Sequence, residues 1–134
     1  MAQIAETLDA QLRGVLTRFA HVEQAILFGS VASGQARADS DLDIAVGASR
    51  ALTLNERINL IASLTKQTGR PIDLIDLKVV TEPLLGQILR HGRRLLGSDT
   101  GYAQLITRHV MDQADFMPYH DRVLAERRAA WIGQ

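Results

Sequence analysis

The sequence predicts a single-domain α/β (or α+β) protein with a small sheet, and two observations support this. Segments with helical periodicity alternate with short apolar segments typical of strands, which predicts layered packing of helices on a sheet. The chain has 134 residues, the length of one ordinary domain, and 46% of them are hydrophobic, enough for a buried core. We therefore expect residues 1–134 to form one domain.

The first part of the chain predicts one helix and two strands. Apolar residues recur at helical spacing over about 3–20, which is typical of an amphipathic helix. The apolar run 25–28 suits a buried strand. Over residues 41–47 the apolar and polar side chains alternate, which predicts a second strand with Asp41 and Asp43 on the same face.

The middle of the chain continues the alternation. Thr53, with Glu56 three residues later, has the pattern of a capping box at the start of a helix. That helix is expected to run to about residue 67 and to end at Gly69. Residues 71–77 then predict a third strand.

Two further helical segments complete the prediction. Thr81, followed by a glutamate and a proline, is expected to begin a helix over about 81–91. Residues 98–131 are mostly helical in pattern, and Pro118 is expected to interrupt them. Four large side chains of this last segment suit either core packing or an exposed patch that a partner covers. They are Phe116, Met117, Tyr119 and Trp131.

The composition narrows the class of protein. With 15 basic and 15 acidic residues the formal net charge is zero, which argues against a general nucleic-acid coat or a membrane-surface protein. There is no cysteine, which excludes disulfides and cysteine-ligated metals. No apolar stretch reaches the roughly 18 residues of a membrane span. We expect a cytoplasmic protein that does not bind nucleic acid directly.

A phosphate-binding turn and a carboxylate pair lie on neighbouring predicted strands. Gly29 lets the backbone approach a ligand, and Ser30 can cap a short helix whose free N–H groups bind phosphate oxygens. Asp41 and Asp43 project from the same strand face and repel each other. A divalent cation would relieve that repulsion, and oxygen ligands favour Mg²⁺ or Mn²⁺. Metal-assisted phosphoryl or nucleotidyl transfer needs both features.

The third predicted strand offers one more carboxylate, from Asp73 or Asp76. These two residues are three apart, so on a regular strand their side chains face opposite ways. Only one of them can join the carboxylate pair, and the residues alone leave the choice open. Lys78 follows the same strand and could reach a phosphate.

Residues 27–46, LFGSVASGQARADSDLDIAV, resemble the motif of the DNA polymerase β-type nucleotidyltransferase superfamily. The resemblance rests on Gly29-Ser30, ten intervening residues and Asp41-Leu42-Asp43, in a version similar to the minimal bacterial and archaeal branch. It is strong over about residues 22–97. It implies a mixed sheet with helices on one face, a core over about 22–97 and a helical extension over about 98–131.

The resemblance also implies an activity. Members of this branch, the minimal nucleotidyltransferases (MNT), use ATP and Mg²⁺ and are commonly encoded beside a HEPN-domain RNase toxin. The MNT protein acts as antitoxin by transferring AMP to a tyrosine of that toxin. The family's third carboxylate sits early in its strand, which favours Asp73 as a metal ligand that helps deprotonate the attacking hydroxyl. Asp41 and Asp43 would bind two Mg²⁺ ions, and Gly29 and Ser30 would hold the triphosphate.

Other polar residues near the motif have both a functional and a structural interpretation. Ser40 either orients Asp41 or caps a turn, and Arg37 contacts either phosphate or only solvent. We treat Ser40 and Arg37 as candidate nucleotide-binding residues. For the basic cluster Arg90–Arg94 we prefer a favourable interaction with a helix C-terminus over a contact with an acidic partner or RNA.

Two other functions fit the same motif. One is an enzyme that modifies a hydroxyl of a small molecule such as an aminoglycoside, and the lack of a separate substrate domain argues against it. The other is an antitoxin that blocks its toxin sterically without catalysis, and the intact aspartates argue against that. Hetero-oligomers with a HEPN toxin are therefore the expected assemblies.

Overall fold

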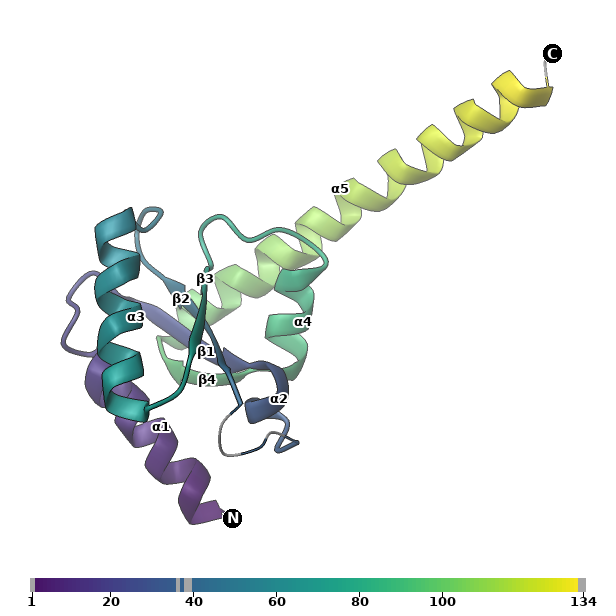
Figure 1. Ribbon diagram of the computed structural model, residues 1–134. Coiled ribbons are helices and arrows are strands. Elements are labelled where there is room, and N and C mark those ends of the chain that lie inside the picture. Colours follow the sequence, from purple (N-terminus) through teal and green to yellow (C-terminus); the bar gives the residue numbers. More distant parts are fainter. Residues whose placement is uncertain (1, 36, 38–39, 133–134) are drawn as a thin grey trace.

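The computed structural model describes residues 2–35, 37 and 40–132, with side chains described at 6–35, 37, 40–114 and 127. Helices and strands alternate along the chain as predicted (Figure 1). The elements are α1 (Ala2–Leu16), β1 (Gln24–Phe28), α2 (Gly29–Ala32), β2 (Leu42–Gly47), α3 (Leu54–Thr68), β3 (Ile72–Asp76), α4 (Leu84–His91), β4 (Arg93–Leu96) and α5 (Asp99–Ile132). None of the described helices is long and apolar enough to cross a membrane.

The four described strands form one mixed sheet in the order β3-β2-β1-β4. β1 is antiparallel to both β2 and β4, whereas β2 and β3 are parallel. A parallel pair needs a long crossover connection, and α3 supplies it with 15 residues. The small mixed sheet that the sequence led us to expect is confirmed.

Helices pack on both faces of this sheet (Figure 1). α1 and α3 cover one face, where Leu12 and Leu60 belong to the same buried cluster as Leu27 of β1. α4 and the start of α5 cover part of the other face, where Leu85 belongs to a second cluster with Ile26. The resemblance implied helices on one face, and the structure adds this second, partly covered face.

The capping box predicted at the start of α3 is confirmed. Thr53 Oγ1 accepts a hydrogen bond from the Glu56 N–H at 3.1 Å, and Glu56 Oε1 accepts one from the Thr53 N–H at 2.8 Å. Hydrogen bonds from the Arg50 guanidinium are the main cause that lowers the pKa of Glu56 to about 2. Gly69 ends the helix in the left-handed conformation, with φ of 69°.

Three helix predictions are wrong in part, and the first is the end of α1, which lies at Leu16 rather than near residue 20. α4 begins at Leu84 rather than Thr81, because residues 82 and 83 form a turn and Pro83 is the N-cap. α5 is one helix through Pro118, where we expected an interruption. Proline removes one backbone hydrogen bond, and the cooperative helix on either side of it continues. Four side chains assigned to a core or a patch lie outside the described side chains: Phe116, Met117, Tyr119 and Trp131.

The strand β4 was missed, because its four residues, RRLL, show neither alternation nor a bounded apolar run. It forms by antiparallel pairing with β1. Arg93 at its start donates from Nε and Nη2 to the carboxylate of Asp9 on α1, at 2.8 and 2.9 Å. Arg93 Nη1 also donates to the Ala32 carbonyl of α2 at 3.4 Å. One side chain therefore joins β4 and α1 to α2, where the candidate site begins.

We expect the Asp9–Arg93 pair to stabilise the fold, because Asp9 is only 7% exposed. Asp9→Asn should lower the free energy of unfolding by about 1–3 kcal/mol, since a half-buried guanidinium loses its ionised partner. Urea unfolding of Asp9→Asn, Arg93→Met and the double variant measures the coupling energy of the pair. A coupling energy near zero would contradict this role.

Candidate active site

The candidate site begins where β1 ends. Gly29 has φ of 76°, and a Cβ at this position would collide with Asp43 Oδ2, so only glycine allows this close approach. α2 starts at Gly29 and its N-cap is Phe28, so the expectation that Ser30 caps this helix is wrong. The first N–H groups of a helix have no acceptor within it, and such groups bind phosphate oxygens. The turn therefore places free N–H groups beside a carboxylate.

The aspartates of the candidate site come together at one end of the sheet, where Asp41 directly precedes β2. Asp43 and Asp73 are direct neighbours across the parallel pair of β2 and β3. Phe28 is the partner of Asp43 on β1. Burial is the largest cause that raises the pKa of Asp43, followed by the charge of Asp73, a hydrogen bond with Asp73 and the charge of Asp41. Asp43 is therefore close enough to both other carboxylates for their charges to act on it.

Asp76 lies on the opposite face of β3 and has a structural role. It is 4% exposed. Its Oδ2 accepts the Leu52 N–H and its Oδ1 accepts the Lys78 N–H, both at 2.8 Å. Both carboxylate oxygens are thus occupied by backbone donors. Of the two aspartates that the sequence left open, Asp73 is the one beside Asp43.

The crowded carboxylates fit a hard divalent cation, because oxygen ligands suit Mg²⁺ and a cation removes their mutual repulsion. Among the residues that the structure describes, no three His, Cys, Asp or Glu side chains are already grouped to hold a metal ion. Asp41, Asp43 and Asp73 as Mg²⁺ ligands therefore stay a prediction that the donor chemistry supports.

Ser40 organises the loop that leads into β2. Its Oγ accepts the Arg37 N–H at 2.8 Å, and its own N–H donates to the Arg37 carbonyl at 3.1 Å. The hydroxyl thus closes a turn directly before Asp41, which agrees with the structural interpretation. The Arg37 side chain is exposed. A nucleotide contact from either residue stays a prediction.

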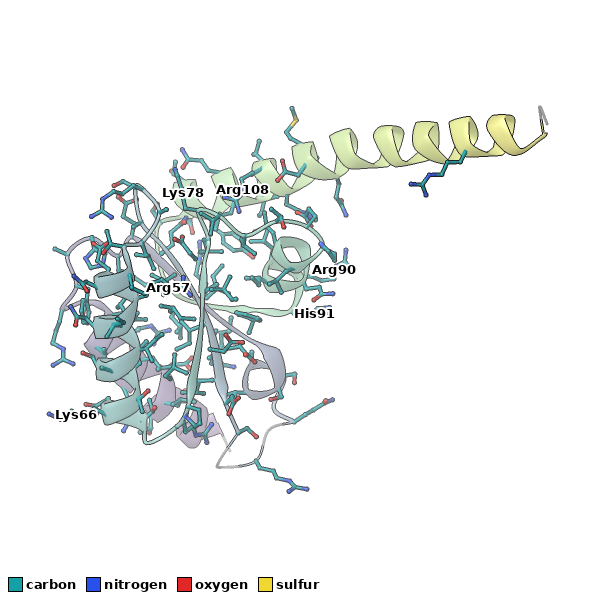
Figure 2. All side chains as sticks on the ribbon, turned by 45° about the horizontal axis from the view of Figure 1, so that its top comes forward. Arg57, Lys66, Lys78, Arg90, His91 and Arg108 are labelled. Atoms are coloured by element: carbon teal, nitrogen blue, oxygen red, sulfur yellow. The ribbon has the colours of Figure 1, made fainter. Side chains whose placement is uncertain are left out.

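Lys78 lies away from the aspartates, and the basic cluster is divided between α4 and β4. Lys78 follows β3 at the end opposite to Asp73, so the two do not lie together. In Figure 2, Lys78 lies near Arg108 and apart from Arg90 and His91. Arg90 and His91 occupy the last turn of α4, the favourable place for cations that we preferred. The last two arginines of the cluster are on β4 instead.

The family is shown by a comparison of this chain with protein-family models. The family described as Polymerase beta, Nucleotidyltransferase matches residues 10–101. The chain belongs to this polymerase β-type nucleotidyltransferase family, and the matched region contains α2 and the three aspartates of the candidate site.

One curated relative matches part of this chain. The chain is 35% identical over 72 residues to the protein adenylyltransferase MntA of Shewanella oneidensis. That alignment spans 54% of this chain and 52% of the relative, so the chain matches about half of the relative's length.

Two solved structures share the fold. One is a toxin–antitoxin crystal structure with AMP-PNP, with a TM-score of 0.77 at 22% identity over 90% of this chain and 98% of that one. The other is the tri-AMPylated HEPN toxin of Shewanella oneidensis in complex with MNT antitoxin, with a TM-score of 0.67 at 23% identity over 90% and 98% of the two chains.

Proposed function

We propose that this chain is a Mg²⁺-dependent nucleotidyltransferase that transfers AMP from ATP to a tyrosine hydroxyl of a HEPN-domain toxin. The observation that carries the proposal is the packing of Gly29 against Asp43, with Asp73 as the direct neighbour of Asp43. This brings a phosphate-binding turn and the carboxylates to one place on the fold of a nucleotidyltransferase family. The AMP donor and the toxin partner come from the relatives described above.

Each residue of the site has a role in the proposed reaction. Backbone N–H groups at Gly29 and Ser30 bind the triphosphate. Asp41, Asp43 and Asp73 hold two Mg²⁺ ions, which when bound neutralise the triphosphate and favour loss of the hydroxyl proton. The tyrosine oxygen forms a bond to the α-phosphorus, the bond from that phosphorus to pyrophosphate breaks, and Asp73 takes the phenolic proton.

A protein acceptor is favoured by the exposed part of α5. This helix continues well beyond the sheet and away from the rest of the domain (Figure 1). Ile106, Val110 and Met111 on its described part are 41%, 54% and 58% exposed. Exposed apolar side chains that lie close together mark surfaces that partners cover. A protein that docks there would bring its acceptor hydroxyl to this domain.

The proposal predicts a mass increase in the toxin. The protein encoded by the adjacent gene, expected to be the HEPN toxin, is incubated with this protein, Mg²⁺ and each NTP in turn, and its intact mass is measured. With ATP the mass should rise by whole adenylyl units. The control is the double variant Asp41→Ala, Asp43→Ala, which should produce no increase.

Other outcomes favour the rival functions. A stable complex without a mass change under any NTP would replace the proposal with steric inhibition of the toxin. If there is neither a complex nor a mass change, a small-molecule acceptor becomes the better explanation. Neutralisation of the toxin by the double variant would also favour steric inhibition.

A further inference from the structure

A cavity of about 290 Å³ lies at the far end of β2 from the aspartates. Its walls come from the start of β1, the end of β2, the segment after β3 and the first turns of α5. Gln24 and Gly47, which are direct partners at one end of the β1–β2 ladder, both line it. Asp43 is four residues from Gly47 along β2, which corresponds to about 13 Å of extended strand. This cavity is therefore separate from the candidate active site.

The Gln24 side chain is held between two glycines at this cavity. A Cβ on Gly47 would lie 2.9 Å from Gln24 Oε1, and a Cβ on Gly101 would lie 2.6 Å from Gln24 Nε2. Neither glycine can therefore carry a side chain without displacing the amide. Within the described part of the chain no hydrogen bond of this amide is found, so its donors and its acceptor are available to a ligand.

Two cations line the same cavity without a carboxylate partner among the described residues. Lys78 makes no ion pair there, and the Arg108 guanidinium makes one long hydrogen bond, from Nη2 to the Val80 carbonyl at 3.4 Å. The two side chains lie close to each other in Figure 2. Glu23 is the single carboxylate in the lining. The cavity therefore has a net positive lining, which favours an anionic ligand.

We propose that this cavity binds the phosphate group of a small phosphate monoester, no larger than a mononucleotide. Lys78 and Arg108 neutralise the phosphate, and the fork of the guanidinium suits two of its oxygens. The Gln24 amide donates a hydrogen bond to the third phosphate oxygen. The volume lies near the lower end of small-ligand pockets, which favours a small ligand. This site is independent of the proposed transfer reaction.

The full chain is titrated with inorganic phosphate and, separately, with AMP at constant ionic strength. Binding is monitored through the amide chemical shifts in NMR spectra. Shifts are expected at Gln24, Ser49 and Gly101. Chloride and adenosine, which lacks phosphate, should produce none there. These shifts should persist in the Asp43→Asn variant, because Asp43 is outside the cavity. Phosphate bound at the aspartate site would instead shift amide signals near Asp43.

Substitutions then distinguish specific phosphate binding by the cavity residues from non-specific attraction by surface charge. Lys78→Gln combined with Arg108→Gln should weaken phosphate binding at least tenfold. The matched control, Lys66→Gln with Arg90→Gln, removes the same number of charges outside the cavity and should leave the affinity unchanged.

Two further variants test the lining in opposite directions. Gln24→Met keeps the volume but removes the amide and should weaken binding. Glu23→Gln removes the one carboxylate and should strengthen it. The proposal is overturned if the three amides do not shift, or if the control pair weakens binding as much as the cavity pair. Thermal unfolding of each variant confirms that it is folded.

Discussion

Asp43→Asn is expected to reduce nucleotidyl transfer by at least about 100-fold, because losing a direct metal ligand should cost no less than losing the outer partners of such ligands, which costs about 10–100-fold. The same change should leave the thermal stability of the metal-free protein equal or higher. Burial and the charges of Asp73 and Asp41 raise the pKa of Asp43, so the ionised carboxylate is less stable in the folded protein than in the unfolded chain. An uncharged asparagine removes this cost, and it also removes a proposed metal ligand.

Asp76→Asn is the matched comparison, because it makes the same chemical change on the adjacent strand. The Asp76 carboxylate accepts two backbone N–H groups, and asparagine offers one acceptor oxygen. We expect Asp76→Asn to lower the free energy of unfolding by about 1–3 kcal/mol and to retain transfer when folded. Thermal unfolding and the intact-mass assay measure both effects. If Asp43→Asn retained full transfer activity, the assignment of these aspartates as the active site would be wrong.

Gly29→Ala is expected to reduce both stability and transfer. With φ of 76° an alanine adopts the left-handed conformation, which costs about 1–2 kcal/mol. Its Cβ would also collide with Asp43 Oδ2 and displace that carboxylate. A displacement of about 1 Å at a reacting centre can cost about 100-fold in rate, so we expect a loss of this size in transfer.

Gly34→Ala separates these two effects. Gly34 has φ of 78°, but a Cβ there would have no neighbouring atom within 4 Å. Its substitution should produce a similar loss of stability through backbone strain alone, with transfer retained. Urea unfolding and the rate of mass increase are measured for both variants. Equal loss of transfer in the two would contradict a specific contact between Gly29 and Asp43.

Local features were predictable from the sequence, because they depend on residues close together in the chain. The capping box of Thr53 and Glu56 satisfies backbone groups within one helical turn. Gly69 ends α3 because glycine adopts the left-handed conformation easily. Alternation along residues 41–47 likewise predicted the strand that carries Asp43.

Features that depend on partners far apart in the chain needed the tertiary structure. The sequence by itself determined the alternation of elements, the family motif and the opposite directions of Asp73 and Asp76. Only strand pairing decided that Asp73 lies beside Asp43, because the register of a parallel pair is not encoded within either strand. β4 exists through its pairing with β1, and Arg93 finds Asp9 across 84 residues. These contacts are non-local, so no spacing in the sequence predicts them. Their partners come together only when the chain folds.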